Sequence, residues 1–165
     1  MIQDDFARAV TSPTLLAVYE TWKTLAAGRI GPRRAELTPA QLRRAMPSTF
    51  TVEVIEGGRD FRFGFAGDKL MQFLDRRCPA PTLAGMKGTN FFAAADTLLR
   101  QCVAGKKPLI SGPRPTTYPG KEYLEREVLL LPLSEDGVQV TSILGAFETW
   151  GLGTHQHAMT PVVAK

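Results

Sequence analysis

The stretch FTVEVIEGGRDFRFGFA, residues 50–66, decides the fold of this chain. Every second residue is apolar in its first half, Phe50–Val54, and three phenylalanines alternate with other residues in its second half, Asp60–Ala66. A period of two is typical of a strand that buries one face. Gly57 and Gly58 stand between the halves and suit a tight turn. We therefore predict an antiparallel β-hairpin.

The flanking sequence changes to helical spacing. Ser12-Pro13 is a helix start, and the apolar residues from Leu15 to Leu25 recur at steps of three and four. After the hairpin we expect two helices, then an extended segment after Pro108 and two long strands; the expected ranges are Pro13–Ala27, Lys69–Leu74, Asn90–Val103, Glu122–Leu133 and Val138–Thr149. These elements predict an α+β fold, with a five-stranded antiparallel sheet that carries the two later helices on one face.

The chain reads as one unit with two appendages. Its 165 residues contain no internal repeat and no long linker. We expect residues 1–47 to form an N-terminal helical extension of the same unit, residues 48–150 the core, and residues 151–165 a tail without regular period. The first helix is the natural candidate to cover the second face of the sheet.

Composition excludes several protein classes. Hydrophobic residues make up 44% of the chain and charged residues 22%, which is ordinary for a soluble globular protein and unlike a collagen or a membrane protein. Two cysteines suit a reducing compartment, and the first ten residues lack the pattern of a signal peptide. We predict a cytoplasmic protein without a membrane anchor.

The net charge of +4 comes mainly from the N-terminal third, through Arg29, Arg33, Arg34, Arg43 and Arg44. Such a face can bind nucleic acid or an acidic partner. An ordinary solvated basic face is the interpretation that we favour, because a charge of +4 is small for a domain. A structural or nucleic-acid-associated protein that uses this face is therefore kept only as the alternative function.

Several short motifs follow one another in a recognisable order; they are Trp22, Gly31-Pro32-Arg33-Arg34, Thr38-Pro39, Met46-Pro47, the strand that ends at Gly67, Gly85, Pro108 and Leu131-Pro132-Leu133-Ser134. This order resembles a PAS domain and, more narrowly, the single-domain PAS-like family common in alphaproteobacteria. That family usually has Leu or Ile where Met46 stands. The resemblance implies a non-catalytic sensory or scaffolding module, with a small cavity between sheet and helices.

The apolar residues suggest where such a cavity would lie. We expect it beside the Asn90–Val103 helix, with a neutral or weakly polar ligand and these lining residues: Phe63, Phe65, Met71, Phe92, Leu99, Leu129 and Leu144. A solid core built from the same phenylalanines is the alternative. Arg33 matches the arginine of the family pattern, and we expect a buried guanidinium that fixes the turn, or else one that holds an anionic ligand.

Signals for cofactors, metals and catalysis are weak. Histidine is absent before residue 155, which argues against a haem ligand, and Arg77-Cys78-Pro79 does not resemble a flavin-binding cysteine motif. We expect Cys102 to be a small core residue and His155 and His157 to lie in a solvated tail. Glu125 and Glu127 share one side of a strand and are expected on an exposed, charge-paired edge. We predict no cofactor, no metal and no enzymatic activity.

The apolar stripe of the Pro13–Ala27 helix must be buried somewhere. It can cover its own sheet or pair with the same helix of a second chain, and the PAS resemblance favours a homodimer that does some of both. The sequence thus predicts a PAS-type signalling module that acts through protein contacts with an unidentified partner. A small apolar ligand is the expected input.

Overall fold

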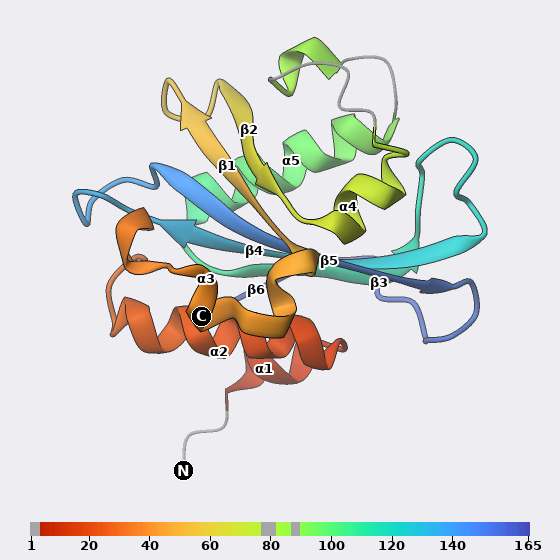
Figure 1. The fold of residues 1–165 in the computed structure, drawn as a ribbon, viewed down its shortest axis with the longest axis horizontal. Helices are drawn as coiled ribbons and strands as arrows, with labels where there is room; N and C mark the ends of the chain where they lie inside the picture. The colour runs from red at the N-terminus through yellow and green to blue at the C-terminus, as the bar shows by residue number, and fades with distance from the viewer. Residues whose placement is uncertain (1–3, 77–81, 87–89) are drawn as a thin grey trace.

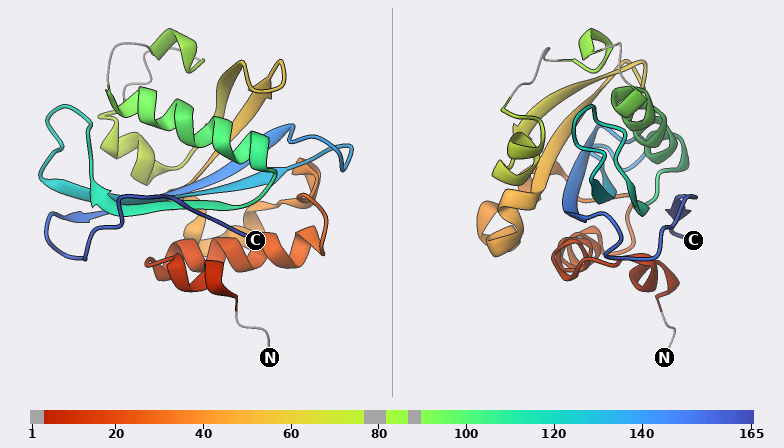
Figure 2. Two further views of the ribbon diagram at one scale, coloured as in Figure 1. Left: turned by 180° about the vertical axis from the view of Figure 1, so that it is seen from behind. Right: turned by 90° about the vertical axis from the view of Figure 1, so that its right-hand side faces the viewer.

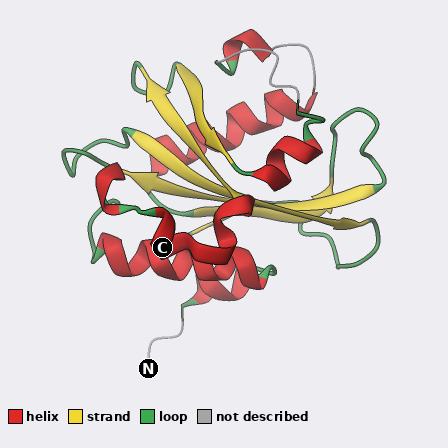
Figure 3. Ribbon diagram, viewed as in Figure 1, coloured by secondary structure: helices red, strands yellow, loops and turns green. Residues whose placement is uncertain are grey.

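The fold of the chain, described by a computed structural model, is a six-stranded antiparallel sheet with helices on both faces (Figures 1 and 3). The structure describes residues 4–76, 82–86 and 90–165. The strands follow the order β2-β1-β5-β4-β3-β6 across the sheet. Their bounds are β1 Thr49–Ile55, β2 Asp60–Ala66, β3 Leu109–Pro115, β4 Leu124–Leu133, β5 Ser142–Gly151 and β6 Val162–Val163. The helices are α1 Asp5–Ala9, α2 Pro13–Ala26, α3 Pro39–Leu42, α4 Asp68–Phe73 and α5 Asn90–Gly105, with short 3-10 turns at Arg34–Glu36, Arg43–Ser48 and Ala84–Met86.

The hairpin predicted from residues 50–66 is confirmed. Strands β1 and β2 pair antiparallel, with Val54 opposite Phe61. On its other side β1 pairs with β5, where Phe50 stands opposite Gly145. The ring of Phe50 occupies the space that a Cβ atom at residue 145 would need. This contact makes glycine the residue that fits at position 145, in the middle of the sheet.

Helices α4 and α5 lie on one face of the sheet, as the sequence predicts (Figure 2). Leu98, Leu99 and Cys102 point from α5 into a core that also contains Leu130 and Phe147 of the sheet. Helix α5 begins at the expected Asn90 and ends two residues later than expected, at Gly105. This layer forms one of two hydrophobic cores.

The second core lies on the opposite face, which α1 and α2 cover (Figure 2). Leu15, Tyr19 and Trp22 of α2 are buried there. The indole Nε1 of Trp22 donates a hydrogen bond to the carbonyl oxygen of Pro132, 2.8 Å away. Most of the apolar stripe is therefore buried within one chain, and the need to bury it no longer argues for a second one.

The C-terminal segment differs from the sequence expectation. Residues 162–163 form β6 on the outer edge of β3, with Leu109 opposite Val163, and the amide of Ala164 donates to the carbonyl oxygen of Pro108 at 2.9 Å. A strand of two residues is too short to leave a periodic pattern, so the sequence could not show it. The sheet consequently has six strands rather than five.

Two further observations concern the expected lack of a membrane anchor and the position of Cys78. Among the described residues, no helix is long and apolar enough to cross a membrane. Cys78, whose neighbours do not resemble a flavin-binding motif, lies outside the described residues.

Candidate functional site

A cavity of about 100 Å³ lies between α5 and the sheet. It is lined mainly by apolar side chains from α4 and the residue after it, from α5 and from five strands: Phe50, Phe63, Leu70, Leu74, Phe91, Ala94, Ala95, Leu98, Leu99, Pro115, Val128, Leu130 and Phe147. Arg114, Arg126 and Thr117 supply the polar part of the wall. The chamber lies where the sequence placed it, but its lining differs from the predicted set.

Of the predicted lining residues on the α5 side of the sheet, some line the cavity and others do not. Phe63 and Leu99 do line the cavity. Phe92 is buried in the same core without being one of the wall residues, and Met71 is half-buried on α4. Phe65 is 44% exposed. The pairing of β2 with β1 shifts register between Phe63 and Ala66, so the alternation that the sequence prediction assumed does not continue to Phe65.

The placement of Leu129 and Leu144 in this pocket is wrong. Both belong to the core beneath α2, on the opposite face of the sheet. Their neighbours Val128 and Leu130 face the cavity instead. The run Val128–Leu131 is apolar throughout because both faces of β4 are covered, so its sequence does not reveal which residues face which layer.

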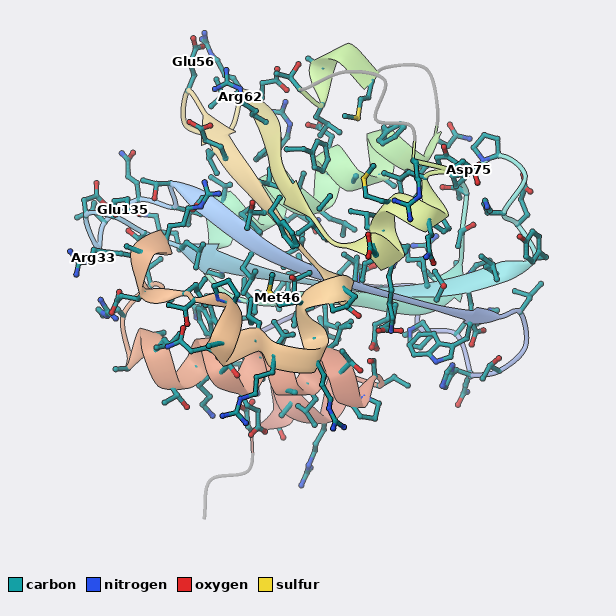
Figure 4. All side chains as sticks on the ribbon, viewed as in Figure 1. Arg33, Met46, Glu56, Arg62, Asp75 and Glu135 are labelled. Carbon is teal, nitrogen blue, oxygen red and sulfur yellow. The ribbon has the colours of Figure 1, made fainter. Side chains whose placement is uncertain are left out.

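The expectation of a buried Arg33 is also wrong. Its side chain is 61% exposed and lies at the edge of the molecule (Figure 4), where its Nε is 3.9 Å from Oε2 of Glu36. The local turn is held by the carboxylate of Glu36 instead, which accepts a hydrogen bond from the backbone amide of Arg33 at 2.6 Å. The start of this turn passes close to the carbonyl of Pro132. Only glycine fits at residue 31, because a Cβ atom there would collide with that carbonyl. Arg33 is thus far from the cavity.

The charged residues of the cavity wall are Arg114 and Arg126, and neither was among the predicted lining residues. They are direct cross-strand partners on β3 and β4. Arg126 is only 8% exposed, and its Nη1 donates to the carbonyl oxygen and the hydroxyl of Ser111 at 2.8 and 2.9 Å. Arg114 is half-buried and donates to the carbonyl oxygen of Met159 at 3.2 Å. Within the described part of the chain, neither guanidinium forms an ion pair with a carboxylate.

The electrostatic state of Arg126 follows from this environment. Burial, and to a smaller extent the positive charge of Arg114, lowers the pKa of Arg126 to about 10 against the opposing charge of Glu127. The guanidinium still carries its charge near neutral pH. Two cationic groups therefore stand at one part of an otherwise apolar chamber, which is an environment that favours a negative charge.

Glu125 and Glu127 are not on an exposed edge. Both are fully buried, because β4 is a central strand and its second face lies under the terminal segments. The carboxylate of Glu127 accepts hydrogen bonds from the amides of Thr11 and Ser12, each at 2.8 Å. Burial raises the pKa of Glu127, although these donors favour its charged form. Glu127 thus ties the start of α2 to the sheet.

His155 and His157 are not in a free tail. Nδ1 of His155 lies 2.6 Å from one oxygen of Glu125, and Nε2 of His157 lies 2.9 Å from the other. The ring of Trp150 meets that of His155 edge-on, at 4.5 Å between centroids. Burial acts to raise the pKa of Glu125, but the two imidazoles outweigh it and hold the pKa below its ordinary value. The carboxylate thereby anchors the C-terminal segment.

The chemistry of the wall suits binding better than catalysis. The described lining residues include no carboxylate, imidazole or thiol that could act as a base or nucleophile. Cys102 lies nearby in the core, 1% exposed, and burial raises the pKa of its thiol to about 12. A protonated, buried thiol is a packing residue, as the sequence predicts.

Comparison with known proteins agrees with this architecture. The family model for a PAS domain matches residues 10–148. Neither curated proteins nor solved structures gave a significant match. The matched range runs from the α1–α2 connection to Glu148 of β5 and includes both arginines of the cavity. By this match over most of its length, the chain belongs to the PAS domain family.

Proposed function

We propose that the chain is a non-catalytic sensory module that binds a small ligand in the α5 cavity and signals through protein contacts. Membership of the PAS family supports a sensory or signalling role. The observation that carries the ligand proposal is the cavity itself, an apolar chamber with a few convergent polar groups. Most of its wall comes from α5 and the central strands, so a bound molecule would contact the rigid part of the fold.

The route for the signal is strand β4. Its three consecutive residues Glu125, Arg126 and Glu127 alternate between the two faces of the sheet. Arg126 lines the cavity, Glu125 holds the C-terminal segment, and Glu127 holds the start of α2. In our proposal, a ligand that displaces Arg126 also shifts the two carboxylates and thereby the terminal segments. Arg114 adds a second connection, because it both lines the cavity and bonds to Met159.

Homodimerisation through α2 remains part of the proposal, because PAS domains commonly mediate dimerisation. Leu16 and Leu25 of this helix stay half-buried, so α2 keeps some apolar surface for a partner. Sedimentation of the full-length protein tests this point. A pure monomer at tens of micromolar would contradict it.

The basic N-terminal face does not support the alternative function. Arg29 forms an ion pair with Glu36 at 2.9 Å, and Arg33 approaches the same carboxylate. This pairing leaves less free positive charge than the sequence alone suggests. Nucleic-acid binding with a steep salt dependence would support the alternative function instead.

Native mass spectrometry of the protein purified from its own host tests the ligand proposal, since it detects bound small molecules. The matched experiment uses Leu99→Trp, which places an indole in the cavity. We expect the native protein to carry a small molecule that the variant lacks, with both retaining the same circular dichroism. Equal occupancy in the two proteins, or none in the native one, would contradict the proposal.

A further inference from the structure

In the part of the chain that the structure describes, the two arginines of the cavity wall form no ion pair with a carboxylate. A buried guanidinium is usually paired with a carboxylate, because removal of an ion from water is costly. Among the described residues, Arg126 instead bonds to a carbonyl and a hydroxyl of Ser111, and Arg114, the residue opposite it, carries the same charge. Like charges side by side in a partly buried site repel each other. An anion between them would relieve this repulsion and gain charge-assisted hydrogen bonds.

The remaining wall limits what that anion carries with it. Apart from Thr117, the other described lining side chains are aliphatic or aromatic, among them Phe50, Leu130 and Phe147. A second charge or a sugar would lie against these groups without hydrogen-bond partners. An apolar cavity of about 150 Å³ accepts a benzene molecule, so a volume of about 100 Å³ holds an apolar chain of roughly four carbon atoms, apart from the carboxylate between the arginines.

We propose that the cavity binds a small monocarboxylate with a short apolar chain, its carboxylate between Arg114 and Arg126 and its chain against the α5 side. This inference rests on the proposed function and specifies its ligand class. It replaces the neutral ligand that the sequence predicted, because that prediction did not place either arginine in the wall. The planar fork of a guanidinium matches a carboxylate in two parallel hydrogen bonds, which explains why arginine suits this position.

The test uses sodium pentanoate as the probe on the full-length protein, with ligand-observed NMR and thermal unfolding as readouts. 1-Pentanol offers a similar chain without the charge, and sodium phosphate offers charge without a chain. We expect pentanoate to bind with a dissociation constant of about 1 mM or tighter, and the other two at least about tenfold more weakly.

Three variants assign the effect to the arginine pair. Arg114→Gln removes one charge, and Arg126→Lys keeps the charge but removes the planar fork, which limits the risk to folding. Each should weaken pentanoate binding by about tenfold to hundredfold. The matched control is Arg62→Gln on β2, where Arg62 is exposed and faces Glu53 at 3.4 Å (Figure 4). It should change binding less than about twofold.

Each other outcome overturns the proposal in a distinct way. Pentanol that binds as tightly as pentanoate would show a neutral site, and the proposed sensory function would stand. Phosphate that binds as tightly would show an anion site to which the apolar chain adds nothing. If no probe binds, the monocarboxylate assignment fails, while the Leu99→Trp comparison still decides the proposed function separately.

Discussion

Filling the cavity from α5 should stabilise the protein and abolish ligand binding. Ala95 is half-buried and lines the chamber, so Ala95→Leu replaces a methyl group with an isobutyl group that points into it. Ala93 lies on the same helix, is exposed and is not a wall residue. Ala93→Leu therefore makes the same chemical change outside the cavity and serves as the control.

The magnitude follows from the cavity volume. Unfilled apolar volume costs about 24 cal/mol per Å³, so about 100 Å³ corresponds to about 2.4 kcal/mol of lost stability. A leucine side chain that fills much of this space should recover about 1–2 kcal/mol, with imperfect fit taking up the rest. In a domain of this size that gain raises Tm by about 2–8 °C. Ala93→Leu should change stability by less than about 0.5 kcal/mol.

The assay is urea unfolding of ligand-free protein, followed by pentanoate titration of the same samples. We expect Ala95→Leu to be more stable and to show no thermal shift with pentanoate, while the control behaves like the parent protein. A destabilised Ala95→Leu that still binds pentanoate would refute the reasoning, because it would show that residue 95 does not share space with the ligand. Equal effects of both substitutions would show that filling the cavity is not the cause.

Three further changes test the packing and the terminal anchors. Trp22→Phe removes the donor to the buried Pro132 carbonyl and should lower the free energy of unfolding by about 1–3 kcal/mol in urea titrations; an unchanged midpoint would contradict this. In the Cys78→Ser variant, the one remaining thiol is that of Cys102. We expect Ellman's reagent to label this buried thiol at about pH 8 only when denaturant unfolds the protein. Rapid labelling of the native protein would show an accessible thiol and contradict this. Glu125→Gln should destabilise the protein above pH 4.5, the ordinary carboxyl pKa. The difference in stability between the variant and the parent should vanish as the pH falls through the lower pKa of the folded state, because the carboxylate then becomes protonated. A difference that is independent of pH would exclude the ionic anchor.

The sequence predicted those parts of the fold whose local pattern has one interpretation. The hairpin at residues 50–66 alternates strictly, and Ser12-Pro13 marks a helix start that the structure confirms at Pro13. The order of these elements was enough for the family resemblance, which the PAS match confirms. Strand β6 could not be predicted in the same way, because its pairing with β3 depends on a tertiary contact and not on local pattern.

The cavity lining was harder to predict because β4 is covered on both faces. In the apolar run Val128–Leu131, no polar residue shows which side is which, and Leu129 was therefore assigned to the wrong layer. A usable signal does exist in the period of two. Arg126 has the same parity as Val128 and Leu130, so any model that places those two side chains in the cavity places Arg126 there as well.

The same parity explains why charged residues can occupy the centre of this sheet. Glu125, Arg126 and Glu127 would be costly neighbours in a strand that buried them without partners. Each carboxylate instead has partners from outside the sheet, imidazoles for Glu125 and amides for Glu127, and these come from opposite ends of the chain. Arg126, on the other face, bonds to Ser111 and forms no ion pair with a carboxylate among the described residues. Stability therefore accounts for the two carboxylates, while the buried arginine is better explained by a ligand that supplies the missing charge.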